Sequence, residues 1–250
     1  MKYILLGLVT FILIGCMGKA PVTQRNQVLL MSPSEEMTLG ANSYKEFLSS
    51  AKISKDAVQT KRVRDIGLRI AKAANREDFK WEFNLVDDKQ INAFCLPGGK
   101  VVVYTGILNL AQNDDQLATV MSHEVAHALA RHGAERMSHQ KISNTIQGLG
   151  NALIGASAPE YINAFNIAYG YGTKLGVMLP YSRSHEHEAD EIGVHLMKKA
   201  GYNINEAVKF WENMKKVKGK SQPEFLSTHP SDDNRIKKIS KIVEKIAKQN

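Results

Sequence analysis

Two histidines stand four residues apart in the segment His123-Glu124-Val125-Ala126-His127, and this spacing constrains the chain more than any other feature of its sequence. Residues four apart lie on one face of an α-helix, so both imidazoles can bind the same metal ion. Zinc is the metal that such a helix typically holds, with the intervening glutamate beside the attacking water. The segment therefore predicts a helix on which His123 and His127 bind zinc and Glu124 acts as general base.

A catalytic zinc site needs a third protein ligand, and a later acidic run is the best source of one. Glu186 and Asp190 are four residues apart on a predicted helix. Glu186 can therefore bind the metal while Asp190 accepts a hydrogen bond from a ligand imidazole. Glu188 is out of phase with both and is the alternative ligand. His185 and His187 flank Glu186 on diverging faces, and we expect them to be polar surface residues.

Helical periodicity fills most of the chain and is interrupted by a short β-rich region. Helices are predicted from about residue 33 to 47, after residue 54, and from residue 114 onward, and strands at 81–85, 91–95 and 101–105. This order predicts an α+β fold in which a small sheet is followed by a helical bundle.

The first residues have the pattern of a secretory signal. A short positive start precedes an apolar run over residues 4–14, which is shorter than a comfortable membrane span. The segment Leu13-Ile14-Gly15-Cys16 resembles a bacterial lipobox, in which cleavage occurs before a cysteine that becomes lipid-modified. We therefore expect a signal peptide over residues 1–15 and a lipid on Cys16. An ordinary signal peptide with an incidental cysteine is the alternative.

Residues 16–31 show no clear period, and we expect them to form a tether that leads from the lipidated cysteine to a single domain over residues 32–250. Met17 after the cysteine resembles outer-membrane lipoproteins of bacteria, which predicts an anchor in the outer membrane and a domain that faces the periplasm. Cys95 would then have no disulfide partner, and we expect its side chain to act as a small buried apolar residue.

The net charge of +8 permits a nucleic acid or an anionic lipid as partner. The lysines, however, are spread along the chain or alternate with apolar residues at helical spacing, which is typical of the solvated face of a packed helix. We therefore expect no nucleic acid partner. A lipoprotein that binds an anionic envelope polymer through its C-terminal lysines is a weaker alternative, because those lysines have no cluster of aromatic residues beside them.

Further motifs accompany the two histidines. They are Glu35-Glu36-x-x-Leu39-Gly40, Asn92-Ala93-Phe94 with Pro97-Gly98-Gly99, Ser182-Arg183-x-x-Glu186-x-x-Ala189-Asp190-x-x-Gly193, and Thr228-His229-Pro230. Together they resemble the zinc metallopeptidases that group HtpX, the CAAX-prenyl endopeptidase and the mitochondrial Oma-type proteases. The resemblance extends over nearly all of residues 32–240.

This resemblance implies a mainly helical, zincin-like domain that binds one zinc ion per chain. It supports Glu186 as the third ligand, and it places His229 over the active site as an oxyanion donor or a fourth ligand in a resting state. A loop residue before the last helix is the alternative for His229. Arg183 and Arg235 can pair with carboxylates near the site, in functional or purely structural ion pairs.

A β-rich stretch follows the two glycines at 98 and 99. The resemblance implies that Val101, Val102, Val103 and Tyr104 form an edge strand beside the metal, which holds substrate backbone by strand addition. An interior strand without substrate contact is the alternative. Because main-chain pairing tolerates many sequences, an edge strand at this place suits the cleavage of unfolded segments.

The resemblance also indicates a function. The chain looks like a lipoprotein member of the periplasmic branch, and we expect a zinc-dependent endopeptidase whose substrates are unfolded or misassembled envelope proteins. The alternative is a zinc-bound chaperone or assembly factor whose peptidase activity is largely latent. Glu124 argues against that alternative, because a purely structural zinc site needs no base.

Overall fold

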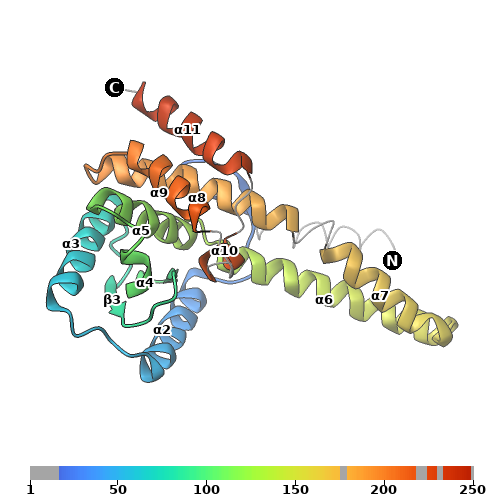
Figure 1. Ribbon diagram of the computed structural model, residues 1–250. Helices are drawn as coiled ribbons and strands as arrows, with labels where there is room; N and C mark the ends of the chain where they lie inside the picture. Colours follow the sequence, from blue (N-terminus) through green and yellow to red (C-terminus); the bar gives the residue numbers. More distant parts are fainter. Residues whose placement is uncertain (1–16, 175–178, 218–223, 230–232, 249–250) are drawn as a thin grey trace.

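The computed structural model describes residues 17–174, 179–217, 224–229 and 233–248 (Figure 1). The helices are α2 (Pro33–Ser50), α3 (Ala57–Ala74), α4 (Thr105–Leu108), α5 (Asp114–Leu129), α6 (His132–Ser157), α7 (Ile162–Thr173), α8 (Leu179–Lys199), α9 (Asn205–Lys216), α10 (Glu224–Thr228) and α11 (Asp233–Ala247), with a 3-10 turn at Pro159–Tyr161. The strands are β1 (Met17–Lys19), β2 (Asn26–Val28), β3 (Glu82–Val86), β4 (Ala93–Leu96) and β5 (Lys100–Tyr104). The predicted α+β class, mainly helical with a small sheet, is confirmed.

Helix α5 is the central element of the fold. Asn113 caps it by accepting a hydrogen bond from the Gln116 N–H, and acidic residues in its first turn suit the positive end of the helix dipole. Most of its side chains are buried, because α3, α8, α9 and β4 all pack against it. Its most extensive contact is with α8, and this contact brings the histidine segment of α5 against the acidic run of α8.

The main sheet corrects one prediction. Its strand order is β3-β5-β4, with β5 parallel to β3 and antiparallel to β4. Val101, Val102, Val103 and Tyr104 therefore lie in the central strand, and the expectation that they form an edge is wrong. The three valines are fully buried, because an unbroken run of β-branched residues suits a strand that is covered on both faces. The edge strand that adjoins α5 is β4.

The segment expected to be a tether also differs from the prediction. Strands β1 and β2 pair antiparallel, and β2 packs against α6. Gln27 is only 2% exposed, and its amide donates hydrogen bonds to the Ala130 carbonyl oxygen and to Glu135. Because this segment packs through polar side chains, its sequence shows no hydrophobic periodicity. The predicted signal peptide (residues 1–15) and Cys16 lie outside the described residues.

Helices α6 and α7 form an arm that extends away from the rest of the molecule (Figure 1). Among the described residues of this arm, none beyond Ser138 is buried, and Leu149 and Leu153 are largely exposed. The two helices are joined by a hydrogen bond from Gln147 to Asn166 at 2.8 Å. In the part of the chain that the structure describes, no helix is long and apolar enough to cross a membrane.

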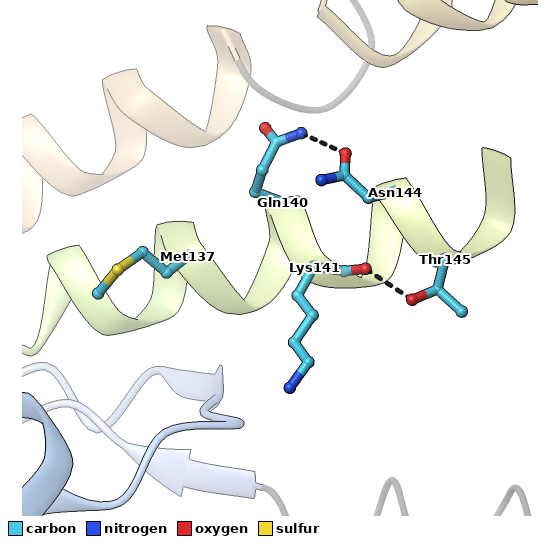
Figure 2. A pocket seen from close by; sticks show the side chains of 5 residues that line it. All are labelled: Met137, Gln140, Lys141, Asn144 and Thr145. Atoms are coloured by element: carbon cyan, nitrogen blue, oxygen red, sulfur yellow. Dashed lines mark hydrogen bonds between the residues drawn. The ribbon is translucent and has the colours of Figure 1, made fainter. Parts of the chain in front are cut away.

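A shallow hollow lies along α6 on this arm (Figure 2). Its lining consists of Met137, Gln140, Lys141, Asn144 and Thr145. Two hydrogen bonds within the helix engage polar groups of this hollow: Gln140 donates to Asn144 at 2.7 Å, and the Thr145 hydroxyl donates to the Lys141 carbonyl oxygen at 2.9 Å (Figure 2). No predicted site residue lines this hollow, so the chemistry lies elsewhere.

Candidate metal centre

Four side chains converge between α5, α8 and the end of α10. One donor atom from each of His123, His127, Glu186 and His229 lies within 4.8 Å of the other three. The Nε2 atoms of His123 and His127 are 3.1 Å apart, and Nδ1 of His229 lies 3.1 and 3.2 Å from the two carboxylate oxygens of Glu186. The structure therefore brings together the four residues that the sequence singled out for the metal.

Helix geometry and one glycine produce this convergence. His123 and His127 share a face of α5, as the spacing predicts. Helix α8 can approach that face because Gly193 has no side chain: a Cβ at this position would lie 3.2 Å from the backbone nitrogen of His123 and 3.3 Å from its Cα. A larger residue at 193 would push α8, and with it Glu186, away from the histidines.

The two candidate carboxylates, Glu186 and Glu188, point in different directions. Glu186 points into the cluster, whereas Glu188 points to His132, whose Nε2 lies 2.9 Å away, and to Arg25, whose Nε donates to it at 2.8 Å. Burial alone would raise the pKa of Glu186. The close contacts with His123 and His229 outweigh burial and hold that pKa well below its usual range, so the carboxylate is ionised.

A buried ion pair between Asp190 and Arg235 holds the ring of His123 on the side that faces away from the cluster. Oδ1 of Asp190 lies 3.0 Å from Nδ1 of His123, a position that accepts the Nδ1–H and leaves Nε2 free to face the cluster. Arg235 donates to Asp190 from Nε and Nη2, both at 2.9 Å, and its guanidinium lies 3.5 Å from the ring centroid of Trp211. Of the two arginines considered from the sequence, Arg235 therefore belongs to the site.

Glu124 is 3% exposed and lies beside the cluster. Its Oε1 accepts no hydrogen bond from the described residues, and Nε2 of His229 is 3.5 Å from it. Burial raises the pKa of Glu124 to about 7, against the opposing charge of His229. A divalent cation in the cluster would oppose this rise. A buried carboxylate oxygen without a hydrogen bond requires an explanation, and beside four metal donors it can accept from a ligand or a reacting group.

The donor set fits zinc. Imidazole nitrogens and a carboxylate oxygen are ordinary zinc ligands, and three of them leave a position for substrate in a catalytic site. Burial lowers the pKa of His127 well below its usual value, so this imidazole is neutral and keeps a lone pair for a metal. Oε1 of Glu124, buried and without a hydrogen bond from the described residues, also points to a ligand at this place.

A cleft of about 520 Å³ opens over these residues. Glu124, His127, Glu186 and His229 line one part of it, and residues 94–97 of β4 and the following turn line another. An edge strand thus borders the site, as the fold prediction required, but this strand is β4 and not Val101–Tyr104.

Sequence reasoning missed a second polar cluster behind the metal ligands. His185 was expected at the surface, yet it is 6% exposed, stacks on His132 at 4.0 Å and places Nε2 3.0 Å from Glu135. His187 is half-buried beside Lys238. A signal was available, because His132 with Glu135 on α6 and His185 with Glu188 on α8 are both pairs three residues apart that share a helix face.

Burial and contacts in this second cluster shift the pKa of both carboxylates and of His132. Burial alone would raise the pKa of Glu135 and of Glu188, but hydrogen bonds with Arg25 and with a histidine outweigh it and hold each pKa at about 2. Burial lowers the pKa of His132 to about 4. At neutral pH the cluster therefore contains two carboxylates, one guanidinium and a neutral His132, which stacks on His185.

Comparison with known proteins places this arrangement among peptidases. Peptidase family M48 matches residues 57–243, a range that contains all four donors. The chain is 34% identical over 245 residues to the mitochondrial metalloendopeptidase OMA1 of Saccharomyces cerevisiae, covering 90% of this chain and 68% of that protein. It is 30% identical over 211 residues to the beta-barrel assembly-enhancing protease of Escherichia coli, covering 82% of this chain and 43% of that protein. More than half of the E. coli relative thus lies outside the match.

Proposed function

Since this chain belongs to peptidase family M48, a family of zinc metallopeptidases, we propose that it is an endopeptidase that cleaves unfolded or misassembled envelope proteins at the periplasmic face of a bacterial outer membrane. The observation that carries the proposal is the carboxylate of Glu124, buried and without a hydrogen-bond partner on Oε1 among the described residues, beside the four-donor cluster. A metal that only stabilised the fold would need no such base.

The chemistry follows from the positions of these side chains. His123, His127 and Glu186 would hold zinc, which supplies a Lewis acid for the scissile carbonyl and lowers the pKa of water. Glu124 takes the proton of the attacking water and passes it to the leaving amine. His229 reaches both carboxylates of the site, since its Nδ1 lies 3.1 Å from Glu186 and its Nε2 3.5 Å from Glu124. From there it can complete the ligand set or donate to the oxyanion.

Strand β4 is the surface that we propose for substrate backbone. Antiparallel pairing turns the backbone groups of alternate residues toward the partner strand. The Tyr104 N–H donates to the Asn92 carbonyl at 3.1 Å and Phe94 pairs with Val102, so residues 92, 94 and 96 face β5. The backbone of Cys95 therefore faces the open edge, at a residue that lines the cleft. An extended segment of an unfolded protein can add to this edge.

Two features support the proposed position of the domain at the membrane: the lipobox pattern and the short separation in sequence between Cys16 and β1. The lipobox pattern predicts a lipid on Cys16, and β1 begins at the next residue, Met17. A lipid at that point would hold the domain close to the bilayer, because no slack chain separates it from the packed strands. The name of the E. coli relative refers to β-barrel assembly, which supports substrates in the cell envelope.

A second candidate function is that of a zinc-bound chaperone or assembly factor with latent peptidase activity. The position of His229 favours it, because a fourth protein donor within 4.8 Å of the other three can close the position that substrate needs.

One experiment separates these functions. The mature chain is incubated with a disulfide-bonded protein in its native form and in its reduced, alkylated, unfolded form, before and after zinc is removed with a chelator and restored. We expect cleavage of the unfolded form, loss of cleavage without zinc, and recovery with about one equivalent of zinc. Binding of the unfolded form by the zinc-loaded chain without cleavage would contradict the peptidase and favour the chaperone. Equal cleavage of both forms would contradict the substrate class.

A further inference from the structure

The N-terminal ribbon, defined as residues 17–28, reaches the metal centre through a chain of side chains. We infer that Arg25 of this ribbon serves the site: Arg25 holds Glu188, Glu188 holds His132, and His132 acts as a positioning residue that orients the ring of the ligand His127. The inference rests on the proposed zinc site and adds to it residues that no ligand motif contains.

The last step of this chain is the contact between two imidazoles. Nδ1 of His132 lies 2.9 Å from Nδ1 of His127, while Nε2 of His127 faces the cluster at 3.1 Å from Nε2 of His123. A metal-binding imidazole normally donates its second N–H to an acceptor, which fixes its tautomer and its orientation. For His127 that acceptor is His132.

The middle step fixes the tautomer of His132. Its Nε2 lies 2.9 Å from Oε2 of Glu188, and a carboxylate can only accept. The proton of His132 is therefore on Nε2, and its Nδ1 keeps the lone pair that accepts from His127. Stacking on His185, with ring centroids 4.0 Å apart and planes inclined by 10°, holds the ring of His132 in its plane.

The first step links the ribbon to the carboxylates of Glu188 and Glu135. Arg25 donates from Nε to Glu188 at 2.8 Å and from Nη1 and Nη2 to Glu135 at 2.9 and 2.7 Å, and Thr23 also donates to Glu188. Both carboxylates are almost fully buried. Among the described residues, Arg25 is the arginine that contacts both of them. Without it, two adjacent buried carboxylates would repel each other and the direction of Glu188 would no longer be fixed.

A purely structural ribbon would stabilise the fold without affecting the metal. Zinc affinity and folding stability are therefore measured separately, by competition with a chromophoric chelator and by urea unfolding of the metal-free chain. The variants are Arg25→Ala, Arg25→Lys and His132→Phe, where phenylalanine keeps the stacked ring and loses both hydrogen bonds. The matched control is Gln27→Ala, which removes a buried ribbon contact to Glu135 but none to Glu188 or His132.

We expect His132→Phe to weaken zinc binding by ~10–100-fold, the range typical for loss of a group that orients a ligand. Arg25→Ala should weaken zinc binding by about 10-fold. Arg25→Lys should weaken it by less, because lysine keeps the positive charge but lacks the several N–H donors of the guanidinium. Gln27→Ala should lower the urea midpoint and leave zinc affinity within about 2-fold. If His132→Phe does not fold, Glu188→Gln takes its place, and we expect this variant to weaken zinc binding as well.

The inference is overturned if Arg25→Ala and His132→Phe keep the zinc affinity of the wild type, or if Gln27→Ala weakens zinc binding as much as Arg25→Ala does. These outcomes leave the proposed peptidase intact, because the wild type would still bind zinc and cleave. A wild-type chain that binds no zinc would instead overturn the proposed function, and the inference with it.

Discussion

Arg235 holds Asp190 through two hydrogen bonds of 2.9 Å, and the same carboxylate lies 3.0 Å from Nδ1 of His123. Arg235 is only 1% exposed and stacks on Trp211. The ring of His123 is thus held by a charge pair that is itself held by an aromatic side chain of α9. The last described helix, α11, contributes Arg235 and so takes part in the metal centre.

Breaking this pair should cost stability as well as metal binding. Arg235→Met leaves Asp190 buried without its partner, and we expect the free energy of unfolding to fall by about 3–5 kcal/mol. Urea unfolding checks this value. The matched control is Lys245→Met on the same helix, whose exposed pair with Glu191 spans 3.3 Å and should contribute no more than about 1 kcal/mol. A similar small effect for both variants would contradict the role assigned to Arg235.

A carboxylate remote from the metal predicts a pH-dependent stability. Glu206 pairs with Lys209 and accepts hydrogen bonds from Asn113 at 3.0 Å and Gln116 at 2.8 Å, and these contacts lower its pKa to about 2. Because the folded pKa lies below that of the unfolded chain, this carboxylate stabilises the fold above about pH 4.5, and the stabilisation is lost as the pH falls toward 2.

Glu206→Gln should therefore lower the free energy of unfolding by about 1–2 kcal/mol at pH 7, and its difference from the wild type should shrink toward pH 3. Urea midpoints between pH 7 and pH 3 measure the effect, with Glu212→Gln as an exposed control on the same helix. A difference that stays constant over this pH range would show that the pKa of Glu206 is not lowered by folding.

The open edge of β4 can be tested with proline. Cys95→Pro removes the backbone N–H that faces the cleft and leaves the pairing of β4 with β5 intact, since proline is tolerated where a strand's N–H points away from the sheet. We expect the KM for an unfolded substrate to rise about 5-fold while zinc content is unchanged. Cys95→Ala, which keeps the N–H, is the control. Equal KM values for the two variants would place substrate backbone elsewhere.

The lipid anchor is tested at Cys16. If the lipobox interpretation holds, Cys16→Ser prevents lipid attachment, and the protein is released from membranes or incompletely processed. Fractionation with radiolabelled palmitate distinguishes these states. A serine variant that is processed normally and sediments with membranes as the wild type does would remove the basis for the proposed location.

The parts of the site that could be predicted are those governed by local helix geometry. His123 with His127, and Glu186 with Asp190, are each four residues apart, so their shared faces follow from the helix itself. The same phase argument separates Glu186 from Glu188, and the structure turns these two carboxylates in different directions. The helix that follows residue 114 and the small sheet before it were also readable from periodicity.

The parts that could not be predicted depend on partners far away in the sequence. Arg25 pairs with Glu135, 110 residues away, and with Glu188, 163 residues away, so nothing in residues 17–31 indicated that they pack on the domain. The edge strand is a different case. The unbroken run Val101–Val103 is typical of a strand covered on both faces, in contrast to the edge position that the family resemblance implies.

The central claim is that Glu124 is the base of a zinc peptidase, and one comparison tests it most directly. Wild type and Glu124→Gln are purified, their zinc content is measured, and both are incubated with the same unfolded protein. The account predicts about one zinc per chain in each, cleavage by the wild type, and less than ~1% of that rate for the variant, because an amide cannot accept the proton of water. Full cleavage by a zinc-loaded Glu124→Gln chain would contradict it.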